Sequence, residues 1–64
     1  MKRFSKELKT EIENTKIDEF LTDILKICEK HGFSLGHEDN HGAFKIVKFN
    51  ESYNEWLLDA HDGT

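Results

Sequence analysis

The residues best suited to chemistry lie together in one short stretch, 36–42, with the sequence GHEDNHG. Two imidazoles, two carboxylates and one amide are placed there between two glycines. Such groups can bind a metal, move a proton, or exchange hydrogen bonds with a ligand or a partner. The residues of this stretch could therefore serve any of these three chemistries. Its candidate residues are His37, Glu38, Asp39, Asn40, His41 and Gly42.

A metal site depends on the structure around the two histidines. His37 and His41 are four residues apart, which places both rings on one face of a helix. On a tight β-hairpin the same two rings point to opposite faces. The chain has no CxxC or HExxH pattern to support a metal. The sequence therefore predicts no metal and no cofactor.

Catalysis would use one of the turn histidines as a general base, oriented by a neighbouring carboxylate. A nucleophile is missing beside them. Cys28 falls on an apolar helical stripe, and Ser34 is a strand residue with no base next to it. We therefore predict that the chain is not an enzyme.

Recognition of a ligand or partner is the third possibility. Gly36, Gly42 and Ala43 would leave bare backbone beside the polar side chains, which allows another molecule to approach closely. Trp56 is a candidate for the same surface, although a core position suits it as well. The predicted binding residues are His37, Glu38, Asp39, Asn40, His41, Gly42, Phe44 and Trp56.

The elements that position this turn begin with a helix over residues 16–31. Thr15 is its expected N-cap and Gly32 its expected left-handed C-cap. The helix has a core-facing stripe with the spacing i, i+3, i+4, i+7, formed by Ile17, Phe20, Leu21, Ile24, Leu25 and Cys28.

After Phe33 the apolar period changes from 3.6 to 2, which predicts a β-hairpin. Asp39 and Asn40 favour a tight turn. A two-residue loop at 39–40 or a four-residue loop at 38–41 pairs Leu35 with Phe44 and Phe33 with Ile46. The two-residue loop also pairs His37 with Gly42 and Glu38 with His41, whereas the four-residue loop frees His41. Either loop keeps the apolar side chains on one face, whereas an odd loop splits them.

Two further elements flank this unit. A closing helix is expected from Asn50 or Ser52, with Ser52 and Glu55 as a capping box, and it ends by Gly63. Residues 1–14 are expected to form an arm or a short helix, because three apolar residues are spaced four apart: Phe4, Leu8 and Ile12.

Composition limits the class of protein. The chain has 64 residues, a net charge of -4 and one cysteine, so it cannot form an internal disulfide. The acidic balance argues against direct nucleic-acid binding, and no apolar stretch is long enough to cross a bilayer. The sequence predicts an α+β helix–hairpin–helix domain over 15–62 in the cytosol of the cell that makes it. Because a lone two-stranded hairpin is marginal, we expect a homo-oligomer, completed by edge-strand pairing or helix packing.

The segment from Cys28 to Phe44, with its HEDNHGAF turn, and the later run Glu55–Leu57 (EWL) resemble a group of small bacteriophage and prophage proteins. The likeness covers about residues 16–60, and most members have no assigned activity. The resemblance implies a phage accessory protein that counteracts a bacterial defence system.

Three modes of action follow from these expectations. The first is docking on a host defence protein, which the acidic charge favours. The second is an oligomeric sponge that holds a nucleotide-derived immune signal between subunits, through His37, His41 and the amides near Gly36 and Gly42. The third is a small regulatory or scaffold dimer.

Overall fold

Helix α1 spans Thr15–His31, as the apolar spacing predicts. Its N-cap is Asn14 rather than the predicted Thr15, because the Asn14 side chain accepts hydrogen bonds from the backbone N–H groups of Lys16 and Ile17. The helix ends at Gly32, whose φ of 74° is the left-handed conformation expected of a C-cap glycine. The predicted C-terminus is therefore confirmed.

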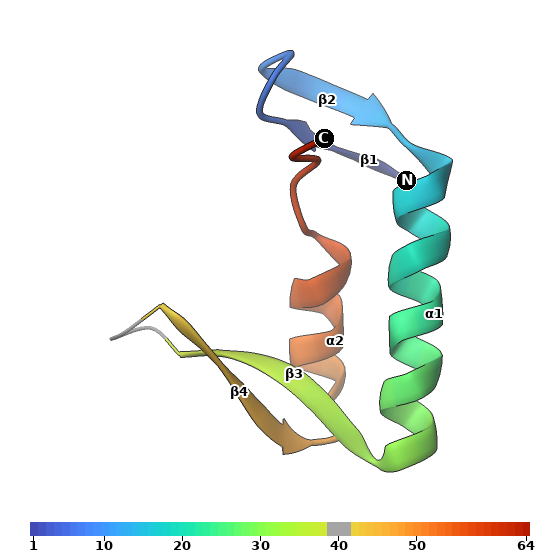
Figure 1. Ribbon diagram of the computed structural model, residues 1–64, viewed down its shortest axis with the longest axis vertical. Helices are drawn as coiled ribbons and strands as arrows, with labels where there is room; N and C mark the ends of the chain where they lie inside the picture. Colours follow the sequence, from blue (N-terminus) through green and yellow to red (C-terminus); the bar gives the residue numbers. More distant parts are fainter. Residues whose placement is uncertain (39–41) are drawn as a thin grey trace.

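The computed structural model describes residues 1–38 and 42–64. The chain runs hairpin, helix, hairpin, helix, which confirms the α+β class (Figure 1). The remaining elements are β1 (Lys2–Ser5), β2 (Thr10–Glu13), β3 (Phe33–Glu38), β4 (Ala43–Lys48) and α2 (Glu51–Leu58).

Strands β3 and β4 pair antiparallel with the predicted parity but a different register. Leu35 lies opposite Ile46, and His37 lies opposite Phe44, so the predicted pairs were wrong by two residues. Gly42 explains the shift. It has a φ of 65°, and its N–H donates to the Glu38 carbonyl at 3.0 Å, so it closes the turn instead of pairing in the strand. Because the shift is even, the apolar residues of both strands still share one face.

Helix α2 covers the opposite face of this hairpin. Ser34 is buried, donates to the Asn54 side chain at 2.8 Å and accepts from the Asn50 backbone N–H at 2.9 Å. Asn50 also caps the helix, accepting from the N–H groups of Ser52 and Tyr53. Of the two predicted starts, Asn50 is confirmed as the cap and the Ser52 capping box is wrong.

Residues 1–14 form a hairpin, not the predicted arm or short helix. Strands β1 and β2 pair from Lys2 with Glu13 to Ser5 with Thr10, and Lys9 takes a positive φ of 56° in the turn. The apolar spacing was misleading, because the buried residues here are polar: Arg3 and Ser5. The strand directs these two residues toward the chain's C-terminal segment.

Arg3 is the centre of that junction. Its guanidinium donates to the carbonyls of Leu58 and Ala60 at 2.9 and 2.8 Å, and to an Asp18 carboxylate oxygen at 2.6 Å. These bonds satisfy the carbonyl of the last α2 residue, which lacks a helical partner, and a carbonyl just beyond the helix. The N-terminal hairpin, the start of α1 and the end of α2 are therefore tied together.

Asp62 provides the second connection at this junction. Its backbone N–H donates to the Phe4 carbonyl at 2.7 Å, and its carbonyl accepts from the Lys6 N–H at 3.1 Å. Its carboxylate accepts from the Asn14 side chain and from Thr64. The C-terminal tail thus lies against β1 as a short parallel bridge.

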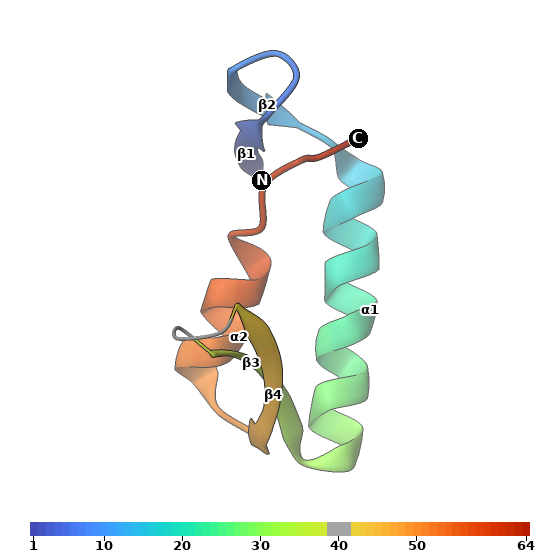
Figure 2. The same ribbon diagram turned by 60° about the vertical axis from the view of Figure 1, so that its left-hand side comes forward.

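The molecule is thin. Its extents are 34 × 28 × 16 Å. The smallest extent, 16 Å, compares with a diameter of about 10–12 Å for a single helix with its side chains. The two hairpins lie at opposite ends of the long axis, with α1 and α2 side by side between them (Figures 1 and 2). Among the described residues, only Leu21 and Cys28 are buried hydrophobics. None of the described helices has the length and apolar character that crossing a bilayer requires.

Candidate functional site

Three of the predicted binding residues come together, although they belong to three different elements. His37 in β3 lies opposite Phe44 in β4. The His37 ring is also 5.4 Å from the ring of Trp56 in α2, with 43° between their planes. We call these three residues the aromatic surface. Asp39, Asn40 and His41 lie outside the described residues.

The twist of a two-stranded ribbon explains how this face reaches α2. At the base of the hairpin, Leu35 and Ile46 face a hollow bounded by α1. Two residues further along each strand, His37 and Phe44 lie beside α2 instead. Two-stranded ribbons twist more strongly than larger sheets, so one continuous face can turn toward different helices at its two ends.

Phe44 and Trp56 line an open hollow of about 490 Å³ together with the end of α2 and the residues after it. Its other lining residues are Leu57, Asp59, Ala60 and His61. Phe44 is 76% exposed and Trp56 40% exposed, so both offer aromatic area to another molecule. Hollows of this size suit a small ligand or one anchoring side chain of a protein partner.

His61 belongs to this site and was not predicted from the sequence. Its ring packs 5.1 Å from that of Phe4, which belongs to the N-terminal hairpin. The imidazole is positioned because the adjacent Asp62 is hydrogen-bonded to β1. Asp62 and β1 are more than fifty residues apart, so their pairing gives no local signal in the sequence.

Glu38 and the glycines are placed differently from the prediction. Glu38 lies opposite Ala43, not His41, and strand alternation directs it away from the face of His37. Gly36 offers no open backbone. A Cβ there would lie 3.0 Å from the Lys45 Cγ, and the Lys45 ammonium lies 5.6 Å from the centre of the Tyr53 ring. Gly36 therefore makes room for the Lys45 side chain, and Gly42 serves the turn.

The described residues offer little for metal or nucleophilic chemistry. Among residues 1–38 and 42–64, no three His, Cys, Asp or Glu side chains are grouped to hold a metal ion. Cys28 is buried, and the Ser34 hydroxyl is held by Asn54. The aromatic surface offers contact area and ring edges that can form hydrogen bonds, so it is suited to binding another molecule.

The perturbed carboxyl groups lie in the N-terminal junction instead. Hydrogen bonds from the Arg3 guanidinium, and then from the chain's terminal ammonium, lower the pKa of Asp18 below its usual 3.8. Hydrogen bonds from the Thr64 side chain and backbone, and then from Asn14, lower the pKa of Asp62. Both shifts come from groups that hold the fold together.

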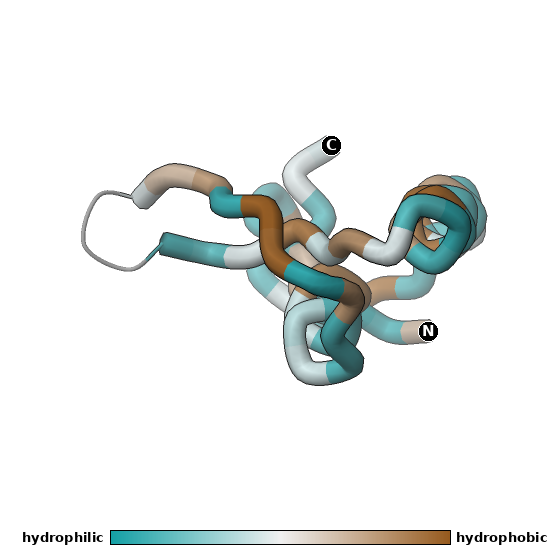
Figure 3. Tube along the Cα trace, turned by 90° about the horizontal axis from the view of Figure 1, so that it is seen from below, coloured by the Kyte–Doolittle hydropathy of each residue, from teal (hydrophilic) through white to brown (hydrophobic). Residues whose placement is uncertain are grey.

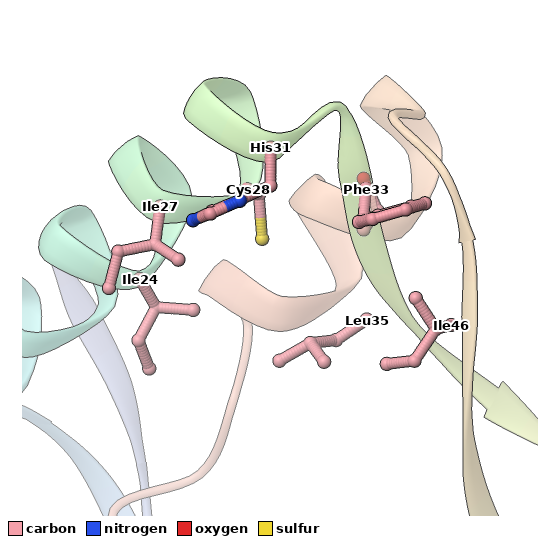
Figure 4. A pocket seen from close by; sticks show the side chains of 8 residues that line it. Ile24, Ile27, Cys28, His31, Phe33, Leu35 and Ile46 are labelled. Carbon is pink, nitrogen blue, oxygen red and sulfur yellow. The ribbon is translucent and has the colours of Figure 1, made fainter.

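A second exposed region lies beside α1. We call it the apolar face, and its residues come from one edge of α1 and from the base of the hairpin. All of them except Phe20 line a hollow of about 220 Å³, into which the α1 and strand side chains point (Figure 4). The apolar face consists of Phe20, Ile24, Ile27, Phe33, Leu35 and Ile46.

The chain matches no protein-family model, no curated protein and no solved structure. The resemblance of its turn and closing helix to small phage proteins therefore stays a prediction.

Proposed function

We propose that this chain is a non-enzymatic binding protein that docks on another protein through the aromatic surface of His37, Phe44 and Trp56. The observation that carries the proposal is the 5.4 Å contact of His37 with Trp56 beside the exposed Phe44, at the rim of an open hollow. Aromatic side chains dominate the energetic centres of protein interfaces, because they bury a large area at small entropic cost.

The class of target follows from the resemblance and the charge. The likeness to phage accessory proteins points to a bacterial defence protein that the chain inhibits. A net charge of -4 favours a basic site on that target, because complementary potentials speed the encounter. Asp59 beside the hollow places a carboxylate next to the aromatic contact area.

Capture from bacterial lysate tests the docking with two matched variants. Phe44→Ser removes the most exposed residue of the aromatic surface, and Leu8→Ser removes a side chain of similar exposure in the N-terminal hairpin. We expect wild type and Leu8→Ser to retain one stoichiometric partner and Phe44→Ser to lose it. Equal capture by all three chains, or no stoichiometric partner for wild type, contradicts the proposal.

Phage plating tests the biological role. Expression of the chain in a defended bacterial strain should restore the plating of a sensitive phage, and Phe44→Ser should not. Because the fold keeps Phe44 exposed, its replacement should leave the helical circular dichroism signal unchanged. Plating that stays low across a panel of defence systems contradicts the anti-defence role without bearing on protein docking.

A second candidate function rests on the composition of the hollow. Phe44 and Trp56 can stack on a nucleobase, His61 can donate to a phosphate oxygen, and Asp59 can accept from ribose hydroxyls. This arrangement favours a sponge for a nucleotide-derived signal. Thermal-shift screening against cyclic nucleotides and ADP-ribose derivatives distinguishes it: a rise abolished by Phe44→Ser supports the sponge, and a flat screen excludes it.

A further inference from the structure

The chain exposes more surface than a folded monomer of its size. Its accessible area is 5100 Å², whereas folded monomers of 7.5 kDa expose about 4250 Å². The excess is about 850 Å² per chain. The radius of gyration agrees, at 12.6 Å against about 10.7 Å expected for 64 residues. The fold is therefore too thin to enclose its own apolar side chains.

Part of the uncovered area lies on the apolar face, where Phe20, Ile27, Phe33 and Ile46 are all exposed. Phe20 and Ile27 lie on one edge of the α1 stripe and are 63% and 58% exposed, although Leu21 and Cys28 on the same helix are buried. Ile46 on β4 is 61% exposed. Figure 3 shows hydrophobic segments in α1 and in the hairpin strands, along one flat layer. Helix α2 covers the other face of the hairpin, and the described part of the chain leaves Phe33 and Ile46 on this face largely exposed.

We propose that the apolar face is covered by the same face of a second copy of this chain, in a two-fold symmetric dimer. The excess of about 850 Å² per chain matches the burial of about 800 Å² per partner in a standard protein interface. A symmetric dimer buries the same patch on both copies, so both lose the excess at once.

The charge distribution is compatible with a second copy as the occupant. Two chains of net charge -4 repel each other, so a self-association surface must keep its acidic groups away from the contact. The hollow at the centre of the apolar face has no carboxylate or ammonium group among its lining residues. They are Ile24, Ile27, Cys28, His31, Phe33, Ser34, Leu35 and Ile46 (Figure 4).

Because the fold is thin, its apolar face must be covered at all times, and not only when a target is bound. A fold with two buried hydrophobic side chains among its described residues has little core of its own. Another copy is present wherever the chain is made. This separates the apolar face, which completes the fold, from the aromatic surface, which is proposed to meet the target.

Sedimentation equilibrium of the purified chain tests the proposal. Wild type should have a mass of about 15 kDa, twice that of one chain. Ile27→Lys should raise the dissociation constant of the dimer by about 100-fold or more, because the two-fold axis brings two unpaired ammonium groups into an apolar contact. The control Leu8→Lys changes a similarly exposed residue outside the apolar face and should remain a dimer.

Ile46→Thr keeps the results interpretable if Ile27→Lys fails to fold. Threonine suits a strand and removes apolar area from the other side of the same hollow, so it should weaken the dimer while the circular dichroism spectrum stays unchanged. A wild-type chain that is monomeric at every concentration tested overturns the proposal. So does a folded Ile46→Thr or Ile27→Lys chain that dimerises as tightly as wild type. Neither result bears on partner capture through Phe44.

Discussion

Replacing Arg3 tests how the two ends of the chain are held together. Arg3→Ala removes two charge-assisted hydrogen bonds to the carbonyls of Leu58 and Ala60, and the bond to Asp18. Hydrogen bonds from a charged group contribute about 1.5–3 kcal/mol each, so the two carbonyl bonds alone are worth at least about 3 kcal/mol. A 64-residue domain has a total stability of about 3–10 kcal/mol. The substitution therefore removes a large part of the stability of the fold.

Urea unfolding followed by circular dichroism measures this loss. With a slope of about 1 kcal/mol per molar urea, the midpoint should fall by about 3 M, or the variant should be unfolded without urea. Lys2→Ala is the matched control, because Lys2 is the exposed neighbour of Arg3 on β1. All chains are compared at one protein concentration, since association adds to apparent stability. A difference below about 1 kcal/mol between the two variants would refute the role given to Arg3.

Three further perturbations probe other parts of the fold. Ser34→Ala should lower the free energy of unfolding by about 1–3 kcal/mol, because it leaves its buried hydrogen-bond partners unsatisfied. The control Ser52→Ala, on the exposed side of α2, should change it little, and equal losses for the two variants contradict this prediction. Gly32→Ala should cost about 1 kcal/mol through its positive φ alone, since no atom lies within 4 Å of the added Cβ; an unchanged midpoint argues against the left-handed cap. The lowered pKa values of Asp18 and Asp62 mean that their stabilisation is present above about pH 4 and lost as the pH falls through the folded-state values. Acid titration of Asp18→Asn and Asp62→Asn should accordingly show a smaller acid loss than wild type, and an identical loss would be inconsistent with these hydrogen bonds.

The central helix and hairpin were predictable because their signals are local. The apolar stripe of α1 and the glycine after it define a helix from neighbouring residues alone. The alternation after Phe33 likewise indicates strands and requires an even loop. The exact register was not predictable, because shifting it by two leaves the same residues on each face. The backbone conformation of Gly42 decides between the two registers, and this conformation cannot be predicted from the apolar pattern.

The N-terminal hairpin was missed because its stabilising contacts are distant in sequence. From the sequence, Arg3 is expected to be an exposed cation. In the structure it is buried and donates to carbonyls more than fifty residues away. The same applies to His61, whose place in the site follows from the pairing of Asp62 with β1. Phe44 and Trp56 were named as candidates, but their common hollow depends on ribbon twist and helix packing, which the sequence does not reveal.

The central claim is that the aromatic surface is where the chain meets its partner. Trp56 is the single tryptophan of the chain, so fluorotryptophan places one fluorine label at that surface. Its fluorine NMR signal should shift and broaden when the captured partner is added to saturation, and Phe44→Ser should require far more partner for the same change. A signal that stays in place while the partner is fully bound would contradict the claim.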